Sequence, residues 1–128
     1  MSSIFTKLIN GELPCHKIAE NDEFIAFLDI MPLTEGHTLV VPKQEIDYIF
    51  DIADDKLARM MVFAKAVALQ VEKAIPCLRI GVGVIGLEVR HAHIHLIPLQ
   101  KPTINFTAKK ISFTQEELAA TAARIVNI

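Results

Sequence analysis

Residues 91 to 98 read His91-Ala92-His93-Ile94-His95-Leu96-Ile97-Pro98 and hold three of the five histidines of the chain. Histidine alternates with apolar side chains here, and a period of two is typical of a β-strand with two unlike faces. We therefore predict a strand over residues 91–99, with three imidazoles on one face and Ala92, Ile94 and Leu96 facing the core. A core does not accept unpartnered imidazoles and a solvated face does not require them, so the triplet indicates a site of chemistry.

Upstream of this strand, the hydrophobic period predicts one short helix and three strands. Ser2 or Ser3 is the expected cap of a helix that ends at Asn10-Gly11, a pair that tolerates left-handed backbone. Residues 16–19 and 24–30 form the expected hairpin, and the β-branched run at residues 38–42 forms the next strand.

Two further helices and one further strand are predicted. In residues 46–75 apolar side chains recur at three- and four-residue steps, with Asp54 as the expected cap of the helix. Residues 78–84 alternate as a strand, and a capping-box pattern at residue 114 predicts a helix over residues 115–126. The order of elements predicts an α+β fold with a five-stranded, largely antiparallel sheet, one long helix and a C-terminal helix.

Length and composition limit the classes of protein to which this chain can belong. A chain of 128 residues with 52% hydrophobic side chains suits a single domain, residues 1–128, with its own core. The formal charge of −2 gives no footprint for nucleic acid or an anionic membrane, and no apolar run approaches the ~20 residues of a membrane span. Two distant cysteines and the absence of a signal-like start predict a reduced, cytoplasmic protein.

Three aligned imidazoles suit two kinds of chemistry. Neutral imidazole is a common ligand of zinc and related metals, but three such positions on one strand face span about 13 Å at ~3.3 Å per residue and do not converge easily on one ion. Two of them could share an ion with ligands from elsewhere. A linear array instead matches an extended phosphate chain, along which one imidazole attacks phosphorus while its neighbours orient it and assist the leaving group. The alternative is a histidine cluster with a structural role and no chemistry.

Other blocks of sequence accompany the triplet in a fixed order. They are Ile4-Phe5 with Lys7, Ile9, Gly11-Glu12 and Pro14; Ala26-Phe27-Leu28-Asp29-Ile30 with Pro32; and Gly36-His37-Thr38-Leu39-Val40-Val41-Pro42-Lys43. Together with the triplet they resemble the histidine triad (HIT) superfamily, in its small Hint-like branch. The resemblance implies nucleotide hydrolysis or transfer at a phosphoramidate or phosphoanhydride bond.

The resemblance also implies roles for four histidines. His93 is expected to attack the α-phosphate and to carry a nucleotidyl intermediate that water resolves. The backbone carbonyl of His91 is expected to fix the tautomer of His93, and His95 to contact the phosphate and assist the leaving group. His37 is expected to support the triad from the next strand.

A pocket for a purine nucleotide of adenosine type is implied as well. Apolar side chains are expected to sandwich the base, and the Asp29 carboxylate to accept hydrogen bonds from the ribose hydroxyls. The expected substrate-binding residues are Ile4, Phe5, Leu8, Phe27, Asp29, Ile30 and Glu88.

Three departures from the family pattern affect these expectations. Many relatives hold a structural zinc through two cysteines and a histidine, whose positions are taken here by Ser3, Thr6 and Glu45, so we expect no metal and no other cofactor. Amide side chains common in the family are replaced by Ile80 and Leu87.

At position 88 a small residue that can touch phosphate is replaced by Glu88. A carboxylate there opposes a bound phosphate unless Arg90 or Lys43 compensates.

Three functions remain open at this point: a histidine-nucleophile hydrolase or transferase, a nucleotide-binding regulatory module, and a metal-binding protein that uses the histidine cluster. A homodimer is expected in each case, because residues 60–63 are consecutive apolar residues of the long helix and the strand at residues 78–84 could pair across a two-fold axis. The resemblance implies the same assembly.

Overall fold

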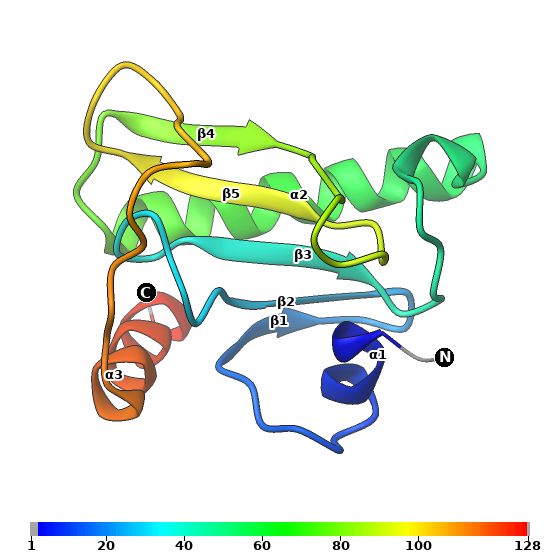
Figure 1. Cartoon of the computed structure of the whole chain (residues 1–128), viewed down its shortest axis with the longest axis horizontal. Coiled ribbons are helices and arrows are strands. Elements are labelled where there is room, and N and C mark those ends of the chain that lie inside the picture. Colours follow the sequence, from blue (N-terminus) through cyan, green and yellow to red (C-terminus); the bar gives the residue numbers. More distant parts are fainter. Residues whose placement is uncertain (1–2, 128) are drawn as a thin grey trace.

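Five strands form one antiparallel sheet in the order β1-β2-β3-β5-β4 (Figure 1). They are β1 (Lys17–Glu20), β2 (Phe24–Leu28), β3 (Thr38–Pro42), β4 (Arg79–Gly83) and β5 (Ile94–Leu99). The computed structural model describes residues 3–127, and the alternative cap Ser2 lies outside the described residues. The predicted α+β class and the five-stranded sheet are confirmed.

Three α-helices accompany the sheet: α1 (Ile4–Ile9), α2 (Asp54–Ala74) and α3 (Gln115–Val126). Ser3 caps α1, because its hydroxyl accepts a hydrogen bond from the Thr6 N–H at 3.1 Å. The predicted capping box at the start of α3 is present between Thr114 and Glu117. Within residues 3–127, no helix is both long and apolar enough to cross a membrane.

Two element boundaries differ from the expectation for local reasons. Strand β2 ends at Leu28 instead of residue 30, because the Asp29 carboxylate accepts a hydrogen bond from the Met31 N–H at 2.9 Å and turns the chain away from the sheet. The cap of α2 is Ala53 and not Asp54, which lies in the first turn. An acidic residue in the first turn is favourable because the N-terminus of a helix carries a partial positive charge.

Strand β5 begins at Ile94, three residues later than predicted. The N–H of Ala92 donates to the carbonyl of Ile46 at 2.7 Å, outside the strand ladder. This bond also holds Ile46, where the helical period begins, beside residue 92 and outside any helix, and α2 begins only at Asp54, the predicted cap. A short 3-10 helix, η1 (Ile49–Asp51), follows before α2 begins.

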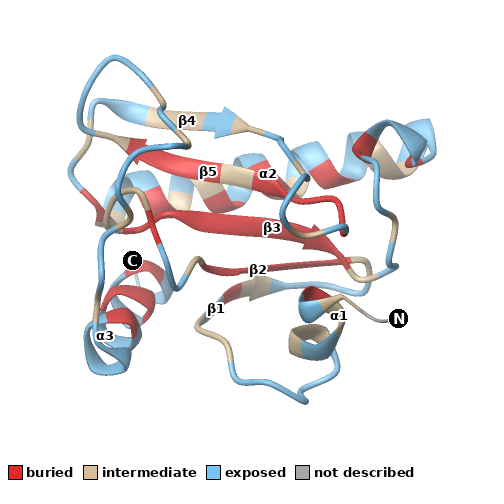
Figure 2. Ribbon diagram, in the orientation of Figure 1, coloured by how far each residue is buried: buried red, intermediate tan, exposed pale blue. Residues whose placement is uncertain are grey.

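Strands β2 and β3 and most of β5 are buried between two faces of the sheet that carry different side chains, whereas β4 is more exposed (Figure 2). One face packs on α2 and α3 through a continuous apolar core. Ala92, Ile94 and Leu96 all enter this core, which confirms the predicted sorting of the alternating stretch. The opposite face holds a smaller apolar cluster beside α1, made of Phe5, Ile25, Phe27, Leu39 and Val41.

A row of directly opposed residues crosses this second face. Phe27 lies opposite Leu39, Leu39 opposite His95, and His95 opposite Gly83. Residues opposed in this way across an antiparallel sheet point to the same side. The row therefore passes from the apolar cluster to a histidine and ends at a glycine without a side chain, which leaves room above the edge strand.

Candidate active site

His91 is fully buried and has a hydrogen-bond partner at each ring nitrogen. Its Nε2 lies 2.7 Å from the carbonyl oxygen of Pro42, which can only accept, so Nε2 carries the proton. Its Nδ1 then accepts from the Ser3 hydroxyl at 2.8 Å. Burial lowers the pKa of His91, so the ring is neutral at pH 7 and links α1 to the end of β3.

The ring of His93 is oriented by the backbone. Its Nδ1 lies 2.8 Å from the carbonyl oxygen of His91, so Nδ1 donates and the lone pair of a neutral ring resides on Nε2. The ring of Phe5 meets it edge to face, with centroids 4.9 Å apart and an interplanar angle of 84°. His93 is 6% exposed, so only a small part of its ring is open to an incoming group.

A second chain of hydrogen bonds fixes His95. The N–H of Leu33 donates to His37 Nδ1 at 3.0 Å, so the proton of His37 resides on Nε2. That Nε2 lies 2.9 Å from His95 Nδ1 and donates to it, which leaves the N–H of His95 on Nε2. The rings of His93 and His95 are adjacent, with centroids 4.8 Å apart. The site thus pairs a lone pair on His93 with a hydrogen-bond donor on His95.

Burial keeps this second pair of histidines uncharged. Desolvation, aided by the neighbouring histidine, lowers the pKa of His37 to about 3. Desolvation also lowers the pKa of His95 to about 4, with smaller contributions from His93 and Lys110. Both rings are therefore neutral at pH 7, which the bond between their nitrogens requires.

Asp29 lies next to these histidines. Its Oδ2 is 3.8 Å from His37 Nε2, and burial raises the pKa of its carboxyl group against the opposing effect of the Met31 N–H. The ligand atoms of Asp29, His37 and His95 all lie within 4.8 Å of one another. This cluster does not suit a metal, because an ion on His37 Nε2 would move the proton to Nδ1, where it would face the Leu33 N–H donor.

Ser3, Thr6 and Glu45, the positions at which the resemblance implies that a zinc site is missing, form a hydrogen-bonded cluster. Glu45 Oε1 accepts from the Ser3 backbone N–H and from the Thr6 hydroxyl, both at 2.6 Å. These bonds, the backbone one foremost, lower the pKa of Glu45. Hydroxyls and one exposed carboxylate without a thiolate do not fit a structural zinc site, and both nitrogens of His91 already have partners.

The expected base-binding residues divide into two groups. Phe5 and Phe27 are buried and meet edge to face at 5.6 Å, and Leu8 packs against the same cluster. Ile4 and Ile30 are instead 49% and 57% exposed, beyond the cluster. The structure brings the first three together, whereas the two isoleucines are apolar side chains open to solvent.

Glu88 is exposed in the loop between β4 and β5, and its charge contributes to the raised pKa of Asp29. The cations expected to compensate for it are engaged elsewhere. Lys43 pairs with Glu20 at 2.8 Å, and Arg90 pairs with Asp47 at 3.7 Å. Glu88 and Arg90 both lie outside the strands, so no shared strand face brings the Arg90 guanidinium to Glu88.

Two residues near the triad were not anticipated from the sequence. The ring of Phe106 meets that of His95 at 4.9 Å, and Lys110 bonds to the Phe106 carbonyl at 2.8 Å. Both belong to residues 101–113, a segment with no hydrophobic period and therefore no signal that places it.

The HIT domain family matches residues 10–102, which include all four histidines of the site. The chain belongs to this family. The adenosine 5′-monophosphoramidase of Schizosaccharomyces pombe is 38% identical over 103 residues, or 77% of this chain and 74% of that protein. An uncharacterized HIT-like protein of Borreliella burgdorferi is 37% identical over 102 residues, or 74% of this chain and 73% of that protein. The crystal structure of a HIT-like protein involved in cell-cycle regulation from Bartonella henselae has a TM-score of 0.86 and 33% identity, covering 98% of this chain and 95% of that one.

Proposed function

We propose that the chain is a nucleotide hydrolase or transferase that cleaves nucleoside 5′-phosphoramidates or dinucleoside polyphosphates through a nucleotidyl-histidine intermediate. The observation that carries the proposal is the 2.8 Å hydrogen bond from His93 Nδ1 to the His91 carbonyl. It places the lone pair of a neutral ring on Nε2 before any substrate binds, and a pre-oriented lone pair is what an attack on phosphorus requires.

The reaction has two displacements at the same phosphorus atom. His93 Nε2 forms a bond to the α-phosphorus, and the bond from phosphorus to the leaving nitrogen or oxygen breaks. The Nε2–H of His95 donates a hydrogen bond to the phosphate or the leaving group as charge develops, and the leaving nitrogen or oxygen takes up a proton from solvent as it departs. Water then attacks the phosphorus and gives up a proton to solvent, the phosphorus–Nε2 bond breaks, and the nucleoside monophosphate leaves with His93 restored.

Nucleoside binding is proposed for the surface beside α1. The Asp29 carboxylate would accept hydrogen bonds from the ribose hydroxyls, and Phe5, Leu8 and Phe27 would support the apolar wall of the base site. The exposed Ile4 and Ile30 offer apolar area that a base would cover. The similarity to an adenosine 5′-monophosphoramidase supports an adenosine nucleotide as the first substrate to test.

A single-turnover assay with adenosine 5′-phosphoramidate, run with and without EDTA and quenched in alkaline denaturant to preserve a phosphorus–nitrogen bond, tests the proposal. We expect hydrolysis that is independent of EDTA, together with an adenylylated protein detectable by mass spectrometry and mapped to His93. Nucleotide binding without turnover would favour the regulatory module instead. Activity lost to the chelator would favour the metal-binding alternative.

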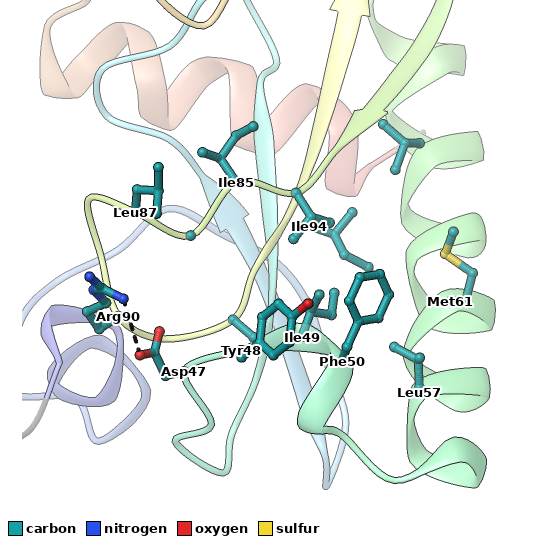
Figure 3. Close-up of a pocket in the computed structure, with 14 residues that line it drawn as sticks. Asp47, Tyr48, Ile49, Phe50, Leu57, Met61, Ile85, Leu87, Arg90 and Ile94 are labelled. Atoms are coloured by element: carbon teal, nitrogen blue, oxygen red, sulfur yellow. Dashed lines mark ion pairs between the residues drawn. The ribbon is translucent and has the colours of Figure 1, made fainter.

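We also propose that the chain forms a homodimer through β4. This edge strand pairs only with β5, and around it lie exposed apolar side chains and a cavity of about 580 Å³ on the α2 face (Figure 3). The exposed apolar residues are Met61, Val62, Val82, Val84, Ile85 and Leu87. An antiparallel pairing of two copies of β4 about a two-fold axis would satisfy the free edge and cover this surface in both copies.

Light scattering at micromolar concentration tests the assembly. We expect a particle of about 28 kDa, twice the 14.2 kDa of one chain. Val82→Glu, which places a charge on the exposed face of β4, should shift the particle to the mass of one chain. A wild-type particle of one chain mass would refute the dimer.

A further inference from the structure

The segment of residues 101–113, here called the strap, follows β5 and runs to α3 (Figure 1). It docks on β4 through two side chains that occupy the space above two glycines. A Cβ at Gly81 would lie 2.8 Å from Ile104 Cδ1, and a Cβ at Gly83 would lie 2.9 Å from Phe106 Cζ. Since Gly83 lies opposite His95, these contacts hold the strap against the same face as the histidine site.

The strap brings a lysine to this site. The Phe106 ring meets the His95 ring edge to face at 4.9 Å, and the Phe106 carbonyl accepts a hydrogen bond from Lys110 Nζ at 2.8 Å. The following residue is tied down as well, because the N–H of Ile111 donates to the Pro32 carbonyl at 2.8 Å. The ammonium group is therefore placed by contacts on both sides of Lys110, next to the residue that covers His95.

The charge of Lys110 is not used by the protein itself. Lys110 is half-buried, and no ion pair involves it among residues 3–127. An ammonium group has three N–H donors, and the Phe106 carbonyl takes one of them. Its positive charge lowers the pKa of Asp29, of His37 and of His95, which is consistent with a position facing all three.

A nucleotide phosphate needs such a charge in this site. The histidines at positions 37, 91 and 95 are neutral at pH 7, while Asp29 and the exposed Glu88 carry the sign of the substrate. The two cations nearest in sequence to the triad and to β3, Arg90 and Lys43, have carboxylate partners of their own.

We propose that Lys110 is a catalytic residue that binds the non-bridging oxygens of the α-phosphate and stabilises the charge that develops on them during attack by His93. This inference rests on the proposed function. It assigns to the strap the electrostatic role that the family's amide and hydroxyl side chains near positions 80, 87 and 88 do not supply in this chain.

The test compares Lys110→Met with Lys110→Arg and with Lys109→Met, a matched control at the exposed neighbouring lysine of the strap. We measure kcat/KM for adenosine 5′-phosphoramidate and, by calorimetry, the affinities for AMP and for adenosine. We expect Lys110→Met to lower kcat/KM by about a hundredfold and to weaken AMP binding about tenfold while leaving adenosine binding unchanged. Lys110→Arg should recover most of both losses, and Lys109→Met should behave as wild type.

The split between AMP and adenosine separates phosphate binding from a merely structural role. If Lys110→Met weakens both ligands equally, Lys110 acts by holding the strap and the inference is wrong. It is also wrong if Lys110→Met hydrolyses the phosphoramidate as fast as wild type. Should the wild type fail to hydrolyse any nucleotide, the proposed function falls, and a selective loss of AMP affinity would still support Lys110 as a phosphate-binding residue.

Discussion

Different interactions order the side chains on the two faces of the sheet. Toward α2 and α3, side chains such as Phe24, Met60 and Ile125 exclude water over a continuous area and need only the right volume. Toward the histidines, the arrangement depends on the direction of individual hydrogen bonds, from Leu33 to His37 and from His93 to the residue 91 carbonyl. If stability depends mainly on the first face and the proposed chemistry on the second, substitutions at neighbouring residues of one strand should affect the two properties separately.

The largest expected effect is on the histidine face. His93→Ala should lower turnover of adenosine 5′-phosphoramidate by at least about 10⁴-fold, because it removes the nucleophile. AMP affinity should change by no more than about threefold, since the nucleophile contributes mostly to the transition state. Burst kinetics and calorimetry on the same preparation check both numbers. Retained turnover, or a loss of affinity without a loss of rate, would remove His93 from the mechanism.

On the opposite face, the volume of a side chain should determine its effect on the stability of the fold. Leu96, which follows His95 in β5 and is 1% exposed, packs in the apolar core. Leu96→Ala should lower the free energy of unfolding by about 2 to 5 kcal/mol, since it leaves a cavity, while kcat/KM at 25 °C stays within about threefold of wild type. Urea denaturation and steady-state kinetics measure the two effects. Equal losses of stability and rate would mean that the faces are coupled.

Acid should weaken the histidine face before it reaches the carboxylates. The pKa values of His37 and His95 lie at about 3 and about 4, below the ordinary value near 6.5, so the unfolded chain takes up protons as pH falls from 6.5 while the folded chain does not. Their contribution to stability is therefore complete above pH 6.5 and is lost as pH falls toward 4.

We expect a loss of about 2 kcal/mol between pH 7 and pH 5, after allowing for solvent screening at the partly exposed His95. Urea midpoints at the two pH values measure it, and His37→Asn should remove a large part of the difference. Glu20, whose bonds to Lys43 and Lys17 lower its pKa from 4.5 to about 2, does not contribute in this range, because its stabilisation is lost only as pH falls below about 4.5. An unchanged pH dependence in His37→Asn would contradict this assignment.

The smallest expected effect concerns Glu88, in the loop between β4 and β5. If Glu88 faces the bound phosphate, Glu88→Ser and Glu88→Gln should each raise kcat/KM by roughly three- to thirtyfold, or about 0.7–2 kcal/mol of transition-state stabilisation. The gain should shrink at high salt because it is electrostatic. A fall in kcat/KM for both variants would show that Glu88 contacts a cationic leaving group instead.

Much of the fold follows from local patterns that tertiary contacts do not override. Ser3, Thr114 and the alternation around Ile94 behave as their types predict, because capping and sheet alternation are decided within a few residues. The expectations fail where a distant partner intervenes. The bond from Ala92 to the Ile46 carbonyl lies outside the sheet ladder where the last strand was predicted to begin, and no local pattern encodes it.

The candidate site was likewise predictable only in part. Clustering of histidines, with the family resemblance, was enough to single out positions 37, 91, 93 and 95, which the structure brings together. The tautomers depend on the Leu33 N–H and the Pro42 carbonyl, which come from turns and strand ends rather than from a motif. Lys110 could not be placed, because residues 101–113 acquire their path from two glycines in β4.

The carbonyl that orients His93 belongs to the main chain, and this affects how the site tolerates change over evolution. A carboxylate partner can be deleted by one substitution, whereas every amino acid at position 91 brings the same carbonyl. Substitution of His91 would therefore first remove its side-chain hydrogen bond to Ser3, which anchors α1. The orientation of His93, the proposed nucleophile, would be affected only afterwards. The orientation of His93 is inherited with the path of the chain, which makes it more durable than any side chain in the site.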